Sequence, residues 1–352
     1  MAINYRNLTT GQRILAVQRL TALWAFTESG LGGIMHALQF PFTGLLVGGM
    51  AVVMICMIAE IAEHNYNQLL KSAIIVLIVK AMASPHTPFP AYIAVGFQAL
   101  LGYGLFRALG VNFFSILLLS IIAMVESAIQ KILILTLFLG ESLWRAIDKM
   151  VSFLTGQFGI ATANGSYWIV GIYLLIHILG GILIAWLALK SIRSFYVEKE
   201  VEDIPFTKPE IIAVNQEKKK NHRKSWIMIL ILLALSVTLF LFAPDKKQGW
   251  VAVTRTITWT VSAILIWYVF ISPLLTKLIR QALKKKQGKY SEEVLQVISF
   301  LPVLQQLTSL AWQQSKKYTG IRHWYHFFSL LIHWSLVYSD NGSLETTPPS
   351  QA

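Results

Sequence analysis

Ionisable side chains stand inside long apolar stretches of this sequence, at Glu28, Glu126 and Lys131. A charge at the centre of a membrane helix costs about 2.5 to 3.5 kcal/mol on insertion scales, so each group needs a partner or a polar cavity. Glu126 and Lys131 are five residues apart, about 140° round an ideal helix, and are poorly placed to pair with each other. We expect each to face a cavity or another helix. Two interpretations stay open: a pocket for a small solute or ion, and a structural salt-bridge or hydrogen-bond network between helices.

Glu28 precedes Ser29 and Gly30, so it either lies at depth or marks a break in its helix near the outer surface. A second polar region is the segment 84–90, whose three prolines exclude a helix. It follows Lys80 and is either a lid over a pocket or a rigid connection between two short spans. The candidate solute-binding residues are Glu28, His36, Lys80, His86, Gln98, Glu126 and Lys131.

Motifs of soluble enzymes are absent from the sequence: there is no GxxxxGK[ST] phosphate loop, no HExxH, no GxSxG and no CxxC. The single cysteine, Cys56, lies in an apolar run, which excludes an intramolecular disulfide and a cysteine metal cluster. We therefore expect a protein that is not an enzyme and that holds no cofactor or metal. Energy for uphill movement of a solute would come from partner subunits.

Histidines near the end of the sequence suggest one alternative. His323, His326 and His333, with His177 opposite, could hold a haem, because membrane haems are often ligated by histidines from facing helices. The tryptophans and tyrosines around them are equally typical of an aromatic belt at the membrane interface.

The elements that must position these residues are membrane helices. The chain is 55% hydrophobic and only 13% charged. Its apolar stretches have the roughly 20 residues that a helix needs to cross a bilayer, and they lack the alternation of barrel strands. The sequence predicts an all-α polytopic membrane protein with about eight spans. Six spans are predicted in the first half, at 14–39, 43–61, 69–83, 91–106, 112–139 and 166–189, and two later, at 226–242 and 251–271.

Polar and amphipathic segments separate these spans. Residues 141–157 are predicted to form an amphipathic helix on the membrane. The charged segment 190–224 is the predicted linker between two sections. A basic stretch, an amphipathic helix at 291–317 and an apolar segment at 323–338 follow the last two spans. The predicted organisation is a six-helix membrane domain at 1–190, a cytoplasmic linker at 191–224, membrane and coupling helices at 225–339 and a disordered tail at 340–352.

The formal net charge of +13 indicates membrane topology, because lysine and arginine collect on the cytoplasmic side. The two richest clusters, at 190–224 and 277–289, are separated by two predicted spans and can face the same side. Counting back six spans places the N-terminus there too, as expected for a multi-pass protein of the cell (inner) membrane. Anionic lipid headgroups are the expected counter-surface, and nucleic acid is not an expected partner.

Two surfaces are predicted to contact other elements or proteins. Ser29, Gly33 and Ala37 recur every four residues and place a small-residue face on one helix, either for docking or for internal packing. The basic helices of the second section are predicted to hold cytoplasmic partner subunits. Their candidate coupling residues are Lys277, Arg280, Lys284, Lys285, Lys286, Lys316 and Lys317.

This arrangement resembles energy-coupling-factor transporters. The first half is similar to an S component in Lys80-Ala81-Met82-Ala83-Ser84-Pro85, which leads through Pro90 into 91–106 with Gly96, Gln98 and Gly102. Residues 254–338 are similar to the coupling region of a T component. There 273–285 would form a first coupling helix, and Ser299-Phe300-Leu301-Pro302 would lead into a second that ends near 311–320. The resemblance implies capture of a vitamin-like solute or metal ion by the first half and coupling to cytoplasmic ATPases by the second.

The leading hypothesis is therefore a membrane transport component that binds a small solute in its first half. The alternatives are a non-catalytic scaffold or assembly factor that recruits a partner through its basic helices, and a haem-containing redox membrane protein.

Overall fold

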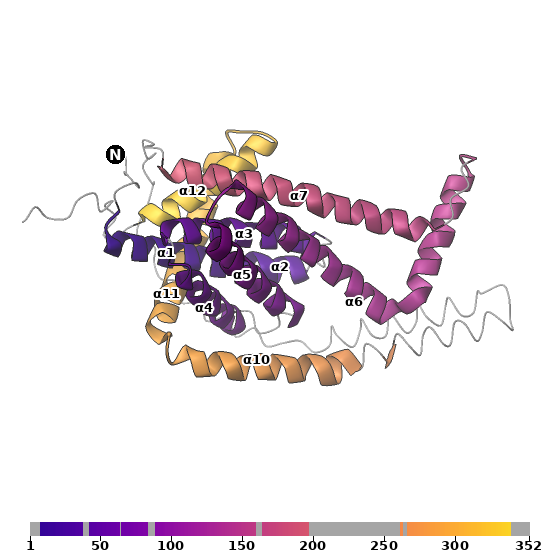
Figure 1. Ribbon diagram of the computed structural model, residues 1–352, viewed down its shortest axis with the longest axis horizontal. Coiled ribbons are helices and arrows are strands. Elements are labelled where there is room, and N and C mark those ends of the chain that lie inside the picture. The colour runs from indigo at the N-terminus through magenta and orange to yellow at the C-terminus, as the bar shows by residue number, and fades with distance from the viewer. Residues whose placement is uncertain are drawn as a thin grey trace, which may run out of the picture. The chain divides into compact units, whose positions relative to one another are not determined.

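The computed structural model describes residues 8–37, 42–63, 65–83, 89–159, 164–196, 261–262 and 266–338 (Figure 1). Every regular element in these ranges is helical and none is a strand, which confirms the predicted all-α class. Among the described helices, five are long and apolar enough to cross a membrane. They are Thr43–Ile61, Phe89–Leu109, Phe113–Glu141, Gly165–Ser194 and Ser291–Ser315. The predicted span at 226–242 and most of that at 251–271 lie outside the described residues.

The chain forms two compact units. The first contains Met1–Ile129, Tyr173–Ile211 and Leu275–Ala352, and the second contains Gln130–Ile172 and Ile212–Leu274. The first unit therefore combines helices from both ends of the sequence, on either side of the charged segment predicted as a linker. Residues 197–224 of that segment are not among those described.

The first unit begins with one helical stretch that changes type along its length. It consists of α1 (Thr10–Phe26), the π-helix η2 (Thr27–Leu31) and α2 (Gly32–Ala37). A capping box begins it: the Thr9 side chain accepts a hydrogen bond from the Gln12 backbone N–H, and the Gln12 side chain accepts one from the Thr9 N–H. This capping box defines the first residue of the helix.

The helix α3 (Thr43–Ile61) is buried along most of its length, because it is apolar on all sides. It packs against α1, α4 (Asn67–Ala83) and α5 (Phe89–Leu109). The helix α4 also packs against α1 and α5, so α3 and α4 have both of these helices as neighbours. The predicted spans at 43–61, 69–83 and 91–106 each fall within one of these helices.

Two long helices, α6 (Phe113–Gly156) and α7 (Gly165–Tyr196), pass through both units. Gly140 interrupts α6 with φ 62° and ψ −158°, a backbone conformation that side-chain-bearing residues rarely adopt. The break separates the apolar first part of α6 from the segment predicted as an amphipathic helix. In the second unit, the Asp148 carboxylate accepts a hydrogen bond from the Ser166 N–H at 2.7 Å, which joins the ends of α6 and α7.

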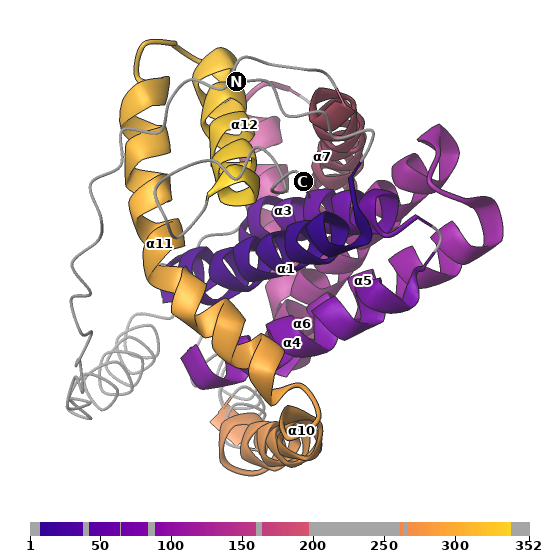
Figure 2. The ribbon, with the colours of Figure 1, turned by 90° about the vertical axis from the view of Figure 1, so that its left-hand side faces the viewer.

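The C-terminal helices are η3 (Ile266–Ile271), α10 (Ser272–Gln287), α11 (Ser291–Ser315) and α12 (Ile321–Val337). The helix α11 crosses α1 and α4 with α12 beside it (Figure 2). The Arg19 guanidinium of α1 lies 3.9 Å from the Phe300 ring centroid of α11. Lys71 of α4 and Glu293 of α11 form an ion pair at 2.6 Å. The segment 291–317, predicted as an amphipathic helix, is thus packed on α1 and α4.

Close approach of α6 and α7 depends on Gly181. A Cβ atom placed on this residue would lie 2.8 Å from the Ile121 Cα and 3.1 Å from the Ser120 carbonyl oxygen. Both of these atoms belong to the backbone, which cannot move aside as the end of a side chain can. The absence of a side chain at position 181 therefore sets the distance between the two helices.

Gly181→Ala should destabilise the protein by about 1 to 3 kcal/mol, because the added methyl group must push the α6 and α7 backbones apart. Gly171 on the same helix is the matched control, since no described atom lies within 4 Å of a Cβ placed there. Gly171→Ala should be neutral or stabilise by roughly 0.5 to 1 kcal/mol. Thermal unfolding in detergent measures both, and equal effects would contradict the close approach of these helices.

Candidate functional site

A buried ion pair joins Glu28 of η2 to Lys80 in the last turn of α4. The Lys80 Nζ donates to the Glu28 Oε2 at 2.6 Å, and the two side chains are 2% and 5% exposed, respectively. The residues are 52 positions apart in the sequence, so the contact exists only because α1 and α4 pack together. It is the most deeply buried of the ion pairs found among the described residues.

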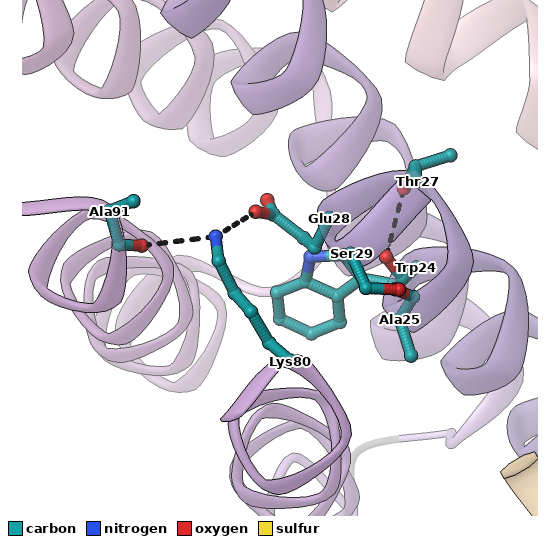
Figure 3. Close-up of polar contacts among 7 residues, drawn as sticks. All are labelled: Trp24, Ala25, Thr27, Glu28, Ser29, Lys80 and Ala91. Atoms are coloured by element: carbon teal, nitrogen blue, oxygen red, sulfur yellow. Dashed lines mark hydrogen bonds and ion pairs between the residues drawn. The ribbon is translucent and has the colours of Figure 1, made fainter. Parts of the chain in front are cut away.

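The π-helix places Glu28 at this point. The Gly32 N–H donates to the Thr27 carbonyl oxygen, five residues back, where an α-helix would use the residue four back. The Thr27 hydroxyl donates to the Trp24 carbonyl at 2.9 Å, and the Ser29 hydroxyl donates to the Ala25 carbonyl at 2.6 Å. These hydroxyls satisfy backbone acceptors in the turn where the helix widens (Figure 3). Short π-helical turns of this kind are frequent at functional sites.

Lys80 reaches a third segment, the beginning of α5. Its Nζ lies 3.4 Å from the Ala91 carbonyl oxygen and 5.9 Å from the centroid of the Tyr92 ring. The carbonyl oxygen and the electron-rich ring face both favour a cation. The ammonium group is therefore held by Glu28 as its main partner and by two weaker contacts from α5.

Two neutral polar groups are buried in the same helices. The Trp24 side chain is fully buried about one helical turn before Glu28, and its Nε1 has no hydrogen-bond partner among the described residues. The same holds for the Gln98 Oε1 on α5, and Gln98 is only 2% exposed. A Cβ on Gly48 would lie 2.9 Å from the Gln98 Nε2, so the glycine makes room for this amide. A buried polar atom without a partner costs about 1 to 3 kcal/mol, which makes both groups candidates for ligand contact.

The energetics of the pair favour a functional interpretation. Removing two charges from water costs several kcal/mol per ion, and their mutual attraction repays this cost only with good geometry. Apolar residues of similar volume often stabilise a protein as well as a buried ion pair does, or better. A buried Glu–Lys pair is therefore weak evidence for stability, and this pair is a candidate for a task that needs both charges.

The structure brings some of the predicted site residues together and not others. Glu28 and Lys80 form the pair, and Gln98 is buried on α5. Glu126 is half-buried on α6, and Lys131 is exposed. His86 lies outside the described residues, as does the side chain of His36.

The predicted small-residue face at Ser29, Gly33 and Ala37 stays a prediction. Ser29 and Gly33 are half-buried, and the Ala37 side chain is outside the described part. Close packing is seen at Gly44 and Gly48 of α3: a Cβ on Gly44 would overlap the Ser127 side chain of α6. The spacing of these two glycines is the G-x-x-x-G pattern, which could have identified this face from the sequence.

Three contributors to the site and its surroundings were missed from the sequence. Trp24 and Tyr92 look like ordinary apolar residues of a span, and no pattern marks them. Arg19, whose guanidinium lies on Phe300, is a charge inside the first predicted span and could have been singled out on that ground.

The histidines are engaged in local contacts. The His177 Nδ1 lies 2.9 Å from the Tyr173 carbonyl oxygen, and the His323 Nδ1 lies 2.7 Å from that of Ser315. The His326 ring stacks on Tyr318 with centroids 4.2 Å apart. Within the described ranges, no group of three or more His, Cys, Asp or Glu side chains could hold a metal ion.

The basic residues predicted to couple to partners lie on or after the C-terminal helices. The Arg280 side chain is not among those described. The others are exposed: Lys277, Lys284, Lys285, Lys286, Lys316 and Lys317.

Comparison of the chain with protein-family models, with curated proteins and with solved structures finds no match.

Lys80→Met should destabilise the protein by about 3 to 5 kcal/mol, because it leaves the Glu28 carboxylate buried without its partner. The double variant Glu28→Leu/Lys80→Met should recover most or all of this loss, since it removes both charges together. Lys71→Met is the matched control on the same helix. It breaks a partly exposed ion pair and should cost at most about 1 kcal/mol.

Unfolding free energies in detergent measure all three variants. A loss for the double variant equal to the sum of the losses for Glu28→Leu and Lys80→Met, each measured alone, would contradict the pairing, because substitutions at independent sites add.

Proposed function

We propose that the protein is a membrane transport component that binds a small solute at the Glu28–Lys80 pair. The observation that carries the proposal is a complementary pair of buried charges at a π-helical turn, about one helical turn after the Trp24 indole N–H, which is buried without a partner among the described residues. Ionisable groups inside membrane helices are costly, and they commonly mark the pathway of a solute or ion. The five apolar helices support a location in a membrane, for which we propose the cell (inner) membrane with a cytoplasmic N-terminus.

The packing of α11 on α1 supports coupling between this site and cytoplasmic partners. Glu28 belongs to the helical stretch that begins with α1, and Arg19 of α1 contacts Phe300 of α11. A shift of α1 on solute binding would therefore act directly on α11. The exposed lysines of α10 and of the turn after α11 carry positive charge toward potential partners. We propose partner subunits that supply energy, such as cytoplasmic ATPases, in keeping with the resemblance to energy-coupling-factor transporters.

Purification in mild detergent, followed by mass spectrometry of everything retained, tests the proposal. We expect the wild-type protein to retain a small solute, and the folded double variant Glu28→Leu/Lys80→Met to lose it. Lys71→Met should retain the solute, because this lysine pairs with Glu293 and not with Glu28.

Recovery of the wild-type chain with neither a solute nor a partner subunit would contradict the proposal. Partner subunits recovered without a solute, equally from the wild-type protein and the double variant, would instead support a scaffold or assembly factor.

A further inference from the structure

We propose that the solute is a zwitterion of amino-acid or betaine type, whose carboxylate replaces Glu28 at Lys80 and whose cationic group replaces Lys80 at Glu28. The inference rests on the proposed function and adds the chemical class of the solute. Glu28 and Lys80 are each other's main partner, and neither side chain is exposed by more than 5%. Any ligand that contacts one of these groups through its charge must draw it away from the other.

Charge balance then restricts what can bind. A solute with one negative charge could pair with Lys80, but it would leave the Glu28 carboxylate buried and unpaired, and a cation would have the opposite effect. Leaving one member of a buried ion pair without its partner is strongly unfavourable. A solute that carries both charges restores an ion pair at each end, so it can part Glu28 from Lys80 without leaving a buried charge.

The groups around the pair fit a carboxylate as the negative end. The Trp24 Nε1–H is a hydrogen-bond donor without a partner among the described residues, and Trp24 precedes Glu28 by about one helical turn, which places both on one side of the helix. A ligand carboxylate offers two oxygens, one for the Lys80 ammonium and one for the indole N–H. The Ala91 carbonyl oxygen, 3.4 Å from the Lys80 Nζ, helps to keep that ammonium in place while its main partner changes.

The backbone around Glu28 can yield in the way this exchange requires. Glu28 stands on a π-helical turn, and Gly30, Gly32 and Gly33 follow within five residues. Glycine is a poor helix former, and an inserted π turn can be removed by a change in hydrogen-bond register. Such a change would alter the position of Glu28 relative to Lys80.

Thermal unfolding of the full-length protein in detergent tests the inference with defined probes. The probes are the twenty L-amino acids and glycine betaine, each assayed as a concentration series. For every compound that raises the unfolding temperature, the carboxamide and, for amino acids, the N-acetyl derivative are assayed as well, since each lacks one of the two charges.

We expect at least one zwitterion to stabilise the wild-type protein saturably, and its singly charged derivatives to bind at least about a hundredfold more weakly, since each leaves one buried charge unpaired. The double variant Glu28→Leu/Lys80→Met should not respond, and Lys71→Met should respond as the wild-type protein does. If Lys71→Met lost the response as the double variant does, the assignment of the solute to the Glu28–Lys80 pair would be overturned.

The inference and the proposed function fail in different ways. A wild-type protein that retains a solute with one charge or none, or that binds the singly charged derivatives as tightly as the zwitterion, would overturn the zwitterion and leave the transport proposal standing. A wild-type protein that neither retains a solute nor responds to any probe would overturn both.

Discussion

A lysine and a glutamate can be held out of water together only if each neutralises the other, and this requirement organises the first unit. Lys80 must reach Glu28 across the interface between α1 and α4, so these helices cannot slide or rotate without breaking the pair. The start of α5 takes part as well, because the Ala91 carbonyl oxygen and the Tyr92 ring also lie near the Lys80 ammonium. Three segments separated in the sequence are thus fixed to one point by one electrostatic constraint.

The helical stretch from α1 to α2 carries this constraint to the rest of the unit. Arg19 and Glu28 are nine residues apart, or about 14 Å along a helix. At one end, the Arg19 guanidinium lies on Phe300 of α11, and at the other, Glu28 pairs with Lys80. The π-helical turn lies between Phe26 and Gly32, where a change in helix register would alter how the two ends are oriented. The ion pair and the packing of α11 therefore both depend on the helical stretch from α1 to α2.

Features that depend on local composition could be predicted from the sequence. The apolar stretch at 43–61 coincides with α3, because length and hydropathy mark a buried helix that is long enough to cross a membrane. The helix α7 continues to Tyr196, past the predicted end at Leu189, because Lys190 and the following residues can extend a helix beyond its apolar part. Glu28 was selected as a candidate because charge within apolar sequence is costly.

What could not be predicted is which distant residues meet. Neither periodicity nor spacing relates Glu28 to a lysine 52 positions later, and from the sequence Lys80 is only a charge beside the proline-rich segment. The π-helix has no sequence signature, and Trp24 is distinguished from other buried aromatics only by the surroundings of its indole N–H. The packing of α11 on α1 could not be predicted either. The apolar residues of α11 indicate that one face is buried, but they do not indicate which helix covers that face.

The burial of the Lys80 ammonium is the claim on which the account depends, and reductive methylation of the folded protein in detergent measures it directly. Lys80 and Lys71 are on the same helix, but their side chains are 2% and 36% exposed, respectively. Peptide mass spectrometry should show Lys71 modified quickly and Lys80 unmodified until the protein is unfolded. Modification of Lys80 at the rate of Lys71 in the folded protein would contradict the account.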